Sequence, residues 1–191
     1  MNSKLMDFVD VQAGHPFRGS IPEDLDGNAY ALQMRDVSPE GGVSWANLVK
    51  TSLDGRKSPA WLTAGDVVFV ARGMRNYALC LEEVPLPTVC SQYFYLLRVK
   101  LPALLPEFLA WQINRAPAQR YLAMNAEGTD QVSIRRGVLE ALPIVVPSLE
   151  QQHRIVALAS AARRERQVLE ALICNREQQL DALASELHAT N

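Results

Sequence analysis

Two short segments of this sequence carry side chains that can hydrogen-bond to nucleic-acid bases. Arg72, Arg75, Asn76 and Tyr77 form the first segment, and residues 129–136 form the second. Arg, Asn and Gln suit bidentate contacts to base edges in the major groove, while Thr, Ser and Lys suit phosphates. The candidate DNA-contacting residues are Arg18, Lys57, Arg72, Arg75, Asn76, Tyr77, Thr129, Gln131, Ser133, Arg135 and Arg136.

Charge is distributed unevenly along the chain. Nineteen Lys and Arg against twenty-one Asp and Glu give a net charge of −2, so bulk attraction to DNA is not expected. Residues 65–136, however, hold eight basic and six acidic side chains, a net +2, while residues 1–64 and 137–191 carry −2 each. The positive charge therefore coincides with most of the candidate contacts.

Catalytic and metal-binding patterns are missing from the sequence. Cys90 or His15 could be assigned to a nucleophile and base pair, but there is no G-x-S-x-G elbow and no Gly-rich phosphate loop. The three cysteines form no C-x-x-C pair and are expected to be buried free thiols. We expect no catalysis, no metal site and no cofactor in this chain.

The N-terminus and the hydropathy of the chain indicate a cytoplasmic protein. Asp7 and Asp10 interrupt the stretch where a secretory signal would need an apolar core. No later segment approaches the ~18 consecutive apolar residues of a membrane span.

The elements that position these residues change in character at Pro147. All eleven prolines and all ten glycines lie at or before this residue. The sequence therefore predicts a mixed α/β domain over residues 1–147, followed by one long coiled-coil helix over residues 148–191.

Apolar runs within the first part predict short strands and a pair of helices. A turn at residues 38–42 is expected to join two antiparallel strands, and the β-branched run 67–71 is expected to be a central strand. Helix is expected from Pro106, interrupted near Pro117 and resumed through Met124. The expected strands are residues 30–35, 43–49, 67–71, 89–100 and 142–146.

The final helix has a recognisable start and a regular apolar seam. Ser148 can cap it, with Gln151 in the position of a capping box. Alternating steps of four and three residues give apolar side chains at eight of ten positions, the period of a coiled coil, with Arg166 and Arg176 at the other two. The apolar seam residues are Ile155, Ala159, Ala162, Leu169, Ile173, Leu180, Leu183 and Leu187. We expect them to pack on another helix, from a second copy or a partner; packing back on the same domain is the alternative.

Several motifs in order resemble the specificity (S) subunits of type I restriction–modification systems, over essentially the whole chain. The most specific stretch runs from Gly128 and Gln131 through Leu142-Pro-Ile-Val-Val-Pro147 to Glu150-Gln151 and Ile155. In the family pattern one residue separates the Leu from this Glu-Gln pair, whereas here Glu150 follows Leu149 directly. Looser matches lie at residues 62–72, 91–98 and 106–114.

The resemblance implies a target-recognition domain joined to a conserved helix, in a subunit that is not itself an enzyme. Such a subunit reads one half of a bipartite double-stranded DNA site and docks methyltransferase subunits that N6-methylate adenine. A restriction motor subunit can join the assembly. S-adenosylmethionine, Mg and ATP would belong to those partner subunits.

Family members carry two recognition domains and two helices, whereas this chain shows one of each and resembles a half-length form. A homodimer through antiparallel helices would then place two identical domains on an interrupted palindrome. Arg166 and Arg176 would pair with Glu165, Glu170 or Glu177, or mark the methyltransferase surface. A coiled-coil adaptor without base readout is the alternative function, and a standalone enzyme a third.

Overall fold

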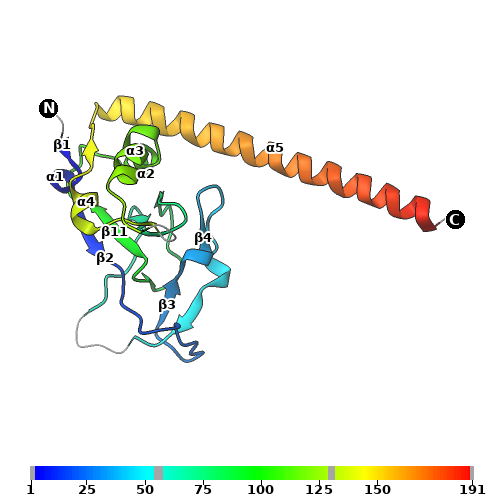
Figure 1. Ribbon diagram of the computed structural model, residues 1–191, viewed down its shortest axis with the longest axis horizontal. Coiled ribbons are helices and arrows are strands. Elements are labelled where there is room, and N and C mark those ends of the chain that lie inside the picture. The colour runs from blue at the N-terminus through cyan, green and yellow to red at the C-terminus, as the bar shows by residue number, and fades with distance from the viewer. Residues whose placement is uncertain (1–2, 54–57, 129–131, 190–191) are drawn as a thin grey trace. The chain divides into compact units, whose positions relative to one another are not determined.

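The computed structural model describes residues 3–53, 58–128 and 132–189 of the chain. The chain divides into two units, residues 1–153 and 154–191. The first unit is a mixed α/β domain and the second is helical, as the sequence predicts (Figure 1).

A four-stranded antiparallel sheet is the largest element of the first unit. Its strands, in spatial order, are β2 (Val9–Ala13), β11 (Phe94–Val99), β7 (Val67–Val70) and β9 (Ala78–Cys80). All four residues of β7 are buried, so the prediction of a central strand is confirmed. Val68 and Val70 join one hydrophobic cluster, which places Val67 and Phe69 on the opposite face by the alternation of a strand.

A three-stranded sheet contributes to the same core. It consists of β10 (Thr88–Cys90), β3 (Ala29–Leu32) and β6 (Val49–Thr51), in that order. β10 and β3 are parallel, with Cys90 opposite Leu32, and among the described strands they are the only parallel pair. The core shared by the two sheets contains Leu32, Val37, Leu48, Leu62, Val68, Val70, Leu79, Leu81, Cys90, Phe94 and Leu96.

Three two-stranded ribbons complete the strands. They are β1 (Ser3–Lys4) with β13 (Pro143–Ile144), β8 (Arg72–Gly73) with β12 (Val132–Ser133), and β4 (Val37–Ser38) with β5 (Gly42–Val43). The short helices are α1 (Leu5–Phe8), the 3₁₀ turns η1 (Met34–Asp36) and η2 (Trp45–Asn47), and α4 (Arg136–Glu140).

Two helices follow the large sheet in the chain, and the first of them packs on its β9 side. α2 (Pro106–Ile113) has proline at its first turn and packs on β7 and β9, and α3 (Ala116–Met124) follows it, as the sequence predicts (Figure 1). Between them, Asn114 Nδ2 donates to Ala78 O at 2.7 Å and Asn114 Oδ1 accepts from Ala78 N at 2.8 Å. The Asn114 amide thus satisfies one backbone unit of the edge strand β9.

Two of the expected strands are wrong in extent. Residues 43–49 contain only the ends of β5 and β6, with η2 between them, and residues 89–100 form two strands because residues 91–93 turn. The expected strands 30–35 and 142–146 are present but shorter, as β3 and β13. Pairing with distant partners sets these limits, which local composition does not record.

The long helix α5 (Leu149–Ala189) starts where the sequence predicts. Ser148 Oγ accepts from Gln151 N at 3.3 Å, which confirms the cap. Gln152, a polar residue in a position that apolar side chains favour, is fully buried: its amide donates to Ala103 O and Pro147 O and accepts from Leu105 N. Polar bonds therefore hold the first turn of α5 in the first unit.

Candidate nucleic-acid interface

The two predicted clusters of candidate DNA-contacting residues meet in the β8–β12 ribbon. Ser133 lies opposite Arg72, and Val132 lies opposite Gly73. Beyond the ribbon, Ile134 N donates to Ala71 O at 2.9 Å, which continues the pairing toward the buried strand β7. Side chains far apart in sequence are thus presented side by side from the end of a rigid core strand.

Arg72 and Arg75 are the two arginines of this region that are exposed and not engaged in a described ion pair. Both are exposed, and neither forms an ion pair with another residue in the described part of the chain. Their guanidinium groups therefore keep their hydrogen-bonding capacity for a ligand.

Asn76 and Tyr77, in contrast, hold the turn that follows β8. Asn76 Nδ2 donates to Val70 O at 2.9 Å, and the Tyr77 hydroxyl donates to Val37 O at 3.2 Å. Burial raises the pKa of the Tyr77 phenol above its ordinary value. These two side chains position Arg75, and their polar atoms are already engaged.

Gly73 lets the ribbon approach η1 closely. Its φ of +148° disfavours a side chain, and a Cβ built on it would lie 2.7 Å from Met34 Cε. The β8 backbone therefore packs directly on Met34, which also lines a pocket.

Arg135 and Arg136 are exposed but paired. Arg135 Nε lies 2.7 Å from Glu127, and Arg136 Nε lies 2.7 Å from Glu140 one turn along α4. Such surface pairs are worth about 0–1 kcal/mol, so a phosphate could compete for either guanidinium.

The remaining candidates lie apart from this ribbon or outside the described residues. Lys57, Thr129 and Gln131 belong to the latter group. Arg18 is exposed on a loop that the Gln92 amide fixes by two bonds to the backbone of Phe17, at 2.9 and 3.1 Å. Arg18 is thus held beside the pocket, next to Gly19 in sequence.

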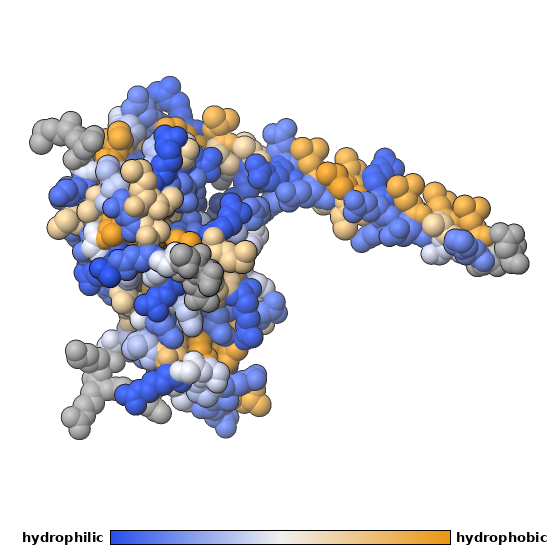
Figure 2. Space-filling model, viewed as in Figure 1, coloured by the Kyte–Doolittle hydropathy of each residue, from blue (hydrophilic) through white to orange (hydrophobic). Residues whose placement is uncertain are grey.

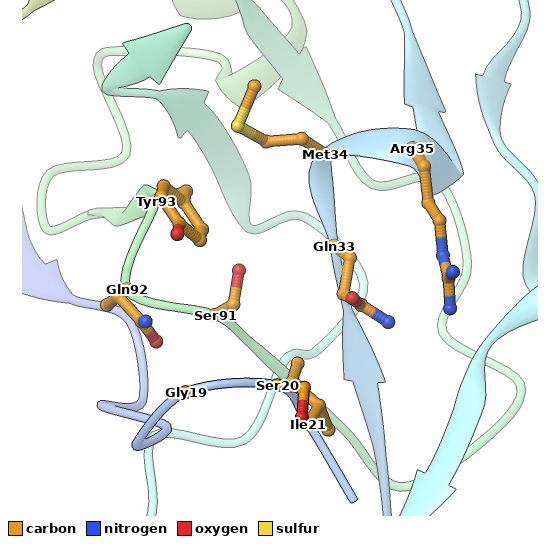
Figure 3. Close-up of a pocket in the computed structure, with 9 residues that line it drawn as sticks. All are labelled: Gly19, Ser20, Ile21, Gln33, Met34, Arg35, Ser91, Gln92 and Tyr93. Atoms are coloured by element: carbon orange, nitrogen blue, oxygen red, sulfur yellow. The ribbon is translucent and has the colours of Figure 1, made fainter. Parts of the chain in front are cut away.

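A pocket of about 300 Å³, which no sequence pattern predicts, opens near the ribbon (Figure 3). Its lining consists of Gly19, Ser20, Ile21, Gln33, Met34, Arg35, Ser91, Gln92 and Tyr93. Gln33 follows β3 directly and Ser91 follows β10, so both lie at the carboxyl ends of the parallel pair. Residues 30–35 and 89–100 read as uniform strands, and no local signal distinguishes their ends.

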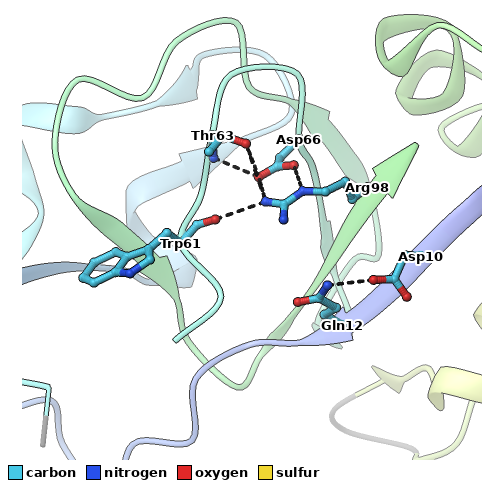
Figure 4. A network of polar contacts seen from close by, with 6 residues as sticks. All are labelled: Asp10, Gln12, Trp61, Thr63, Asp66 and Arg98. Atoms are coloured by element: carbon cyan, nitrogen blue, oxygen red, sulfur yellow. Dashed lines mark hydrogen bonds and ion pairs between the residues drawn. The ribbon is translucent and has the colours of Figure 1, made fainter. Parts of the chain in front are cut away.

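A further arginine is a structural residue. Arg98 binds Asp66 through Nε at 2.8 Å and Nη2 at 2.7 Å, and Nη2 also donates to Trp61 O at 3.1 Å (Figure 4). Asp66 accepts from the backbone and hydroxyl of Thr63 as well. This network fixes the turn that precedes β7. It thereby helps to position the β8–β12 ribbon, which follows β7.

Three solved structures of type I restriction–modification proteins resemble this chain. The S subunit from M. genitalium is 16% identical with a TM-score of 0.57 over 91% of this chain and 41% of that chain. The HsdS subunit from Thermoanaerobacter tengcongensis is 17% identical with a TM-score of 0.55, over 87% and 38% respectively. A chain from a structure on complex assembly and conformational transition of the type I R-M system is 18% identical with a TM-score of 0.62, over 94% and 42%.

The chain has the S-subunit fold. The resemblance noted in the sequence is confirmed at this level, and the chain spans about two fifths of the length of each of these structures. No protein-family model and no curated protein matches it.

The helical unit of this S-subunit fold carries the predicted apolar seam on its surface. Figure 2 shows apolar surface along α5, and Leu169, Ile173, Leu180 and Leu183 are each more than half exposed. Ile155 and Ala159 are half-buried, Ala162 and Leu187 are exposed, and Arg176 donates to Gln179 on the same helix at 3.0 Å.

The cysteines of this S-subunit fold differ from the expectation that all are buried. Cys90 is buried and burial raises the pKa of its thiol to about 12, Cys80 is half-buried, and Cys174 is exposed on α5. The expectation is wrong for Cys174 because the side chains of residues 161–188 of α5 are all exposed.

Within the described residues, no helix is long and apolar enough to cross a membrane. The same part of the chain holds no group of three or more His, Cys, Asp or Glu side chains placed to bind a metal ion.

Proposed function

We propose that this chain is the DNA sequence-specificity subunit of a type I restriction–modification complex. The observation that carries the proposal is the pairing of β8 with β12, which joins both candidate clusters in an S-subunit fold. Arg72 and Arg75 supply unpaired guanidinium groups at this ribbon, and Arg contacts to guanine are the commonest specific contacts to DNA.

In this proposal residues 1–147 recognise one half-site and residues 148–191 form the helix that assembles the complex. The chain docks adenine-N6 methyltransferase subunits, which bind S-adenosylmethionine and perform the chemistry, and a restriction motor subunit can join them. The chain itself has no catalytic role. The polar side chains at the ribbon and the pocket suit DNA binding, because a non-catalytic recognition subunit requires only contacts to bases and phosphates.

The helix is proposed to pair with α5 of a second copy in antiparallel orientation. Residues 149–167 hold four Arg against two acidic side chains, a net +2, while residues 168–189 hold one Arg against four acidic side chains, a net −3. Antiparallel pairing sets the basic half of each helix against the acidic half of the other. It also covers the exposed seam with an identical surface, as two-fold symmetry requires.

Methylation mapping in the source cells tests this function. Deleting the gene should remove N6-methyladenine from one interrupted, palindromic motif, and restoring it should return the mark. An unchanged methylation pattern would contradict the proposal. The purified chain with its methyltransferase should also shift DNA of that motif in a salt-dependent manner, whereas a dimer that never binds DNA would indicate a coiled-coil adaptor.

A further inference from the structure

The pocket lies at a place in the fold where ligands commonly bind. Gln33 and Ser91 are the first residues beyond the carboxyl ends of β3 and β10. In open parallel α/β sheets, ligands bind beyond the carboxyl ends of the strands, and the one parallel pair of the three-stranded sheet offers the same ends. The volume of about 300 Å³ is at the small end of the range for binding pockets and suits a ligand of one nucleotide.

Two polar groups of the lining lack partners. Gln33 Nε2 and Ser91 Oγ are buried and have no hydrogen-bond partner within the part of the chain that the structure describes, and Ser91 as a whole is 1% exposed. The Ser91 hydroxyl points toward the space that the labelled residues enclose (Figure 3). Buried polar groups are normally hydrogen-bonded. A ligand in the pocket could supply an acceptor for the Gln33 amide nitrogen and a donor or acceptor for the Ser91 hydroxyl.

Their backbones are held firmly in place. Gln33 N donates to Asp36 Oδ2 at 2.8 Å, Ser91 N donates to Leu32 O at 3.0 Å, and Ser91 O accepts from Phe94 N at 3.0 Å. A small ligand would therefore reach these two buried atoms by local side-chain movement while the backbone keeps its place, and a fixed backbone favours discrimination between similar ligands.

The rim of the pocket adds a cation and an aromatic ring. The Arg35 side chain is 65% exposed, and its closest ion-pair contact is a long one of 3.7 Å to Asp36. Tyr93 is 40% exposed. A guanidinium suits a phosphate, an aromatic ring suits the face of a base, and a Gln amide with a hydroxyl suits a base edge.

The pocket is continuous with the ribbon. Ala71 N donates to Tyr93 O at 2.9 Å immediately before Arg72, and Met34 packs on Gly73. A ligand bound at Arg72 would therefore lie beside the pocket.

We propose that this pocket binds one nucleotide of the DNA target, with the base edge against Gln33 and Ser91 and the phosphate at Arg35. Gln33 and Ser91 then determine which base is accepted at one position of the half-site. The inference rests on the proposed function and assigns it a specific site.

The test compares the variants Gln33→Met and Ser91→Ala with Thr51→Val in the source cells, with N6-methyladenine mapped across the genome. Among the described residues, Thr51 carries the third buried polar side-chain atom without a partner and the second such hydroxyl. It lies outside the pocket, so Thr51→Val is a matched control. Thermal unfolding of each purified chain verifies folding, and calorimetry with the four deoxynucleoside monophosphates tests whether free nucleotides bind.

We expect the pocket variants to lose preference at one motif position by about tenfold, with the other positions and the melting temperature unchanged. Thr51→Val should retain the wild-type motif. Identical motifs in all three variants would overturn the inference while leaving the proposed function intact, whereas a wild-type chain that directs no motif would overturn both. Free-nucleotide binding that Ser91→Ala abolishes, without a change in motif, would assign the pocket to a small nucleotide and overturn its role in DNA recognition.

Discussion

Arg72 and Ser133 face each other across the β8–β12 ribbon, although the sequence separates them by two strands of the large sheet and two helices. Arg72 is exposed and Ser133 is half-buried. The hydrogen bond from Ile134 N to Ala71 O continues the pairing, so the backbone conformation of the ribbon does not rest on these two side chains. The ribbon therefore presents a contact surface that can vary in its side chains while its backbone stays fixed.

Removal of the free arginines should weaken DNA binding. Arg72→Ala and Arg75→Ala should each cost about 1–3 kcal/mol in affinity if they contact bases, and should reduce the salt slope by about one if they contact phosphates. Titration of the complex with DNA at several salt concentrations measures both quantities. Arg120→Ala, an exposed arginine on α3, is the control and should change neither; unchanged binding in both ribbon variants would exclude these residues from the interface.

The seam of α5 should be required for self-association. Leu169→Asp places a charge at a seam position and should shift the chain from dimer to monomer in sedimentation equilibrium. Val168→Asp makes the same change at the neighbouring residue, which is similarly exposed but lies outside the seam, and should leave the dimer intact. Equal effects of the two substitutions would contradict a dimer through this seam.

Gln152 should be among the residues most sensitive to substitution. Gln152→Leu removes three part-buried hydrogen bonds, to the Leu105 amide and to the carbonyls of Ala103 and Pro147, at a cost of about 2–4 kcal/mol in unfolding free energy. Gln151→Leu changes an exposed neighbour and should cost less than about 0.5 kcal/mol. Urea unfolding of both variants distinguishes a structural amide from a tolerant helix start.

Thiol reactivity should separate Cys174 from Cys90. Only the thiolate reacts, and a pKa of about 12 keeps Cys90 protonated at pH 8, so a thiol reagent should modify Cys174 quickly and Cys90 only after unfolding. Cys174→Ser should remove the fast phase. A fast phase that persists in this variant and is lost in Cys90→Ala would show that Cys90 is accessible.

Local sequence signals were sufficient where an element depends on its own composition. The run Val67–Val70 is a central strand because it is apolar on both faces, and α5 starts at a capping serine and continues without Gly or Pro. Pro106 at the start of α2 is a third case.

Signals of the same kind could not predict the pocket. Gln33 and Ser91 come together only because β3 and β10 pair in parallel across more than fifty intervening residues. Tyr77 likewise resembles a base-contacting residue in sequence, while its acceptor Val37 O lies forty residues away. Asn76 holds the same turn through the nearer Val70 O, a contact that residue type alone does not reveal. Long-range pairing thus decided which polar side chains remain available to a ligand.

The β1–β13 ribbon has a consequence for synthesis of the protein. Ser3 pairs with Ile144, and Leu5 N donates to Leu142 O at 2.9 Å, so β1 is synthesised long before its partner strand and must wait for nearly the last residues of the domain. Contacts between such distant residues slow folding and leave early apolar segments exposed during translation. The domain is complete only when β1 and β13 pair. Deletion of β1 would therefore remove the same ribbon as deletion of β13 just before α5.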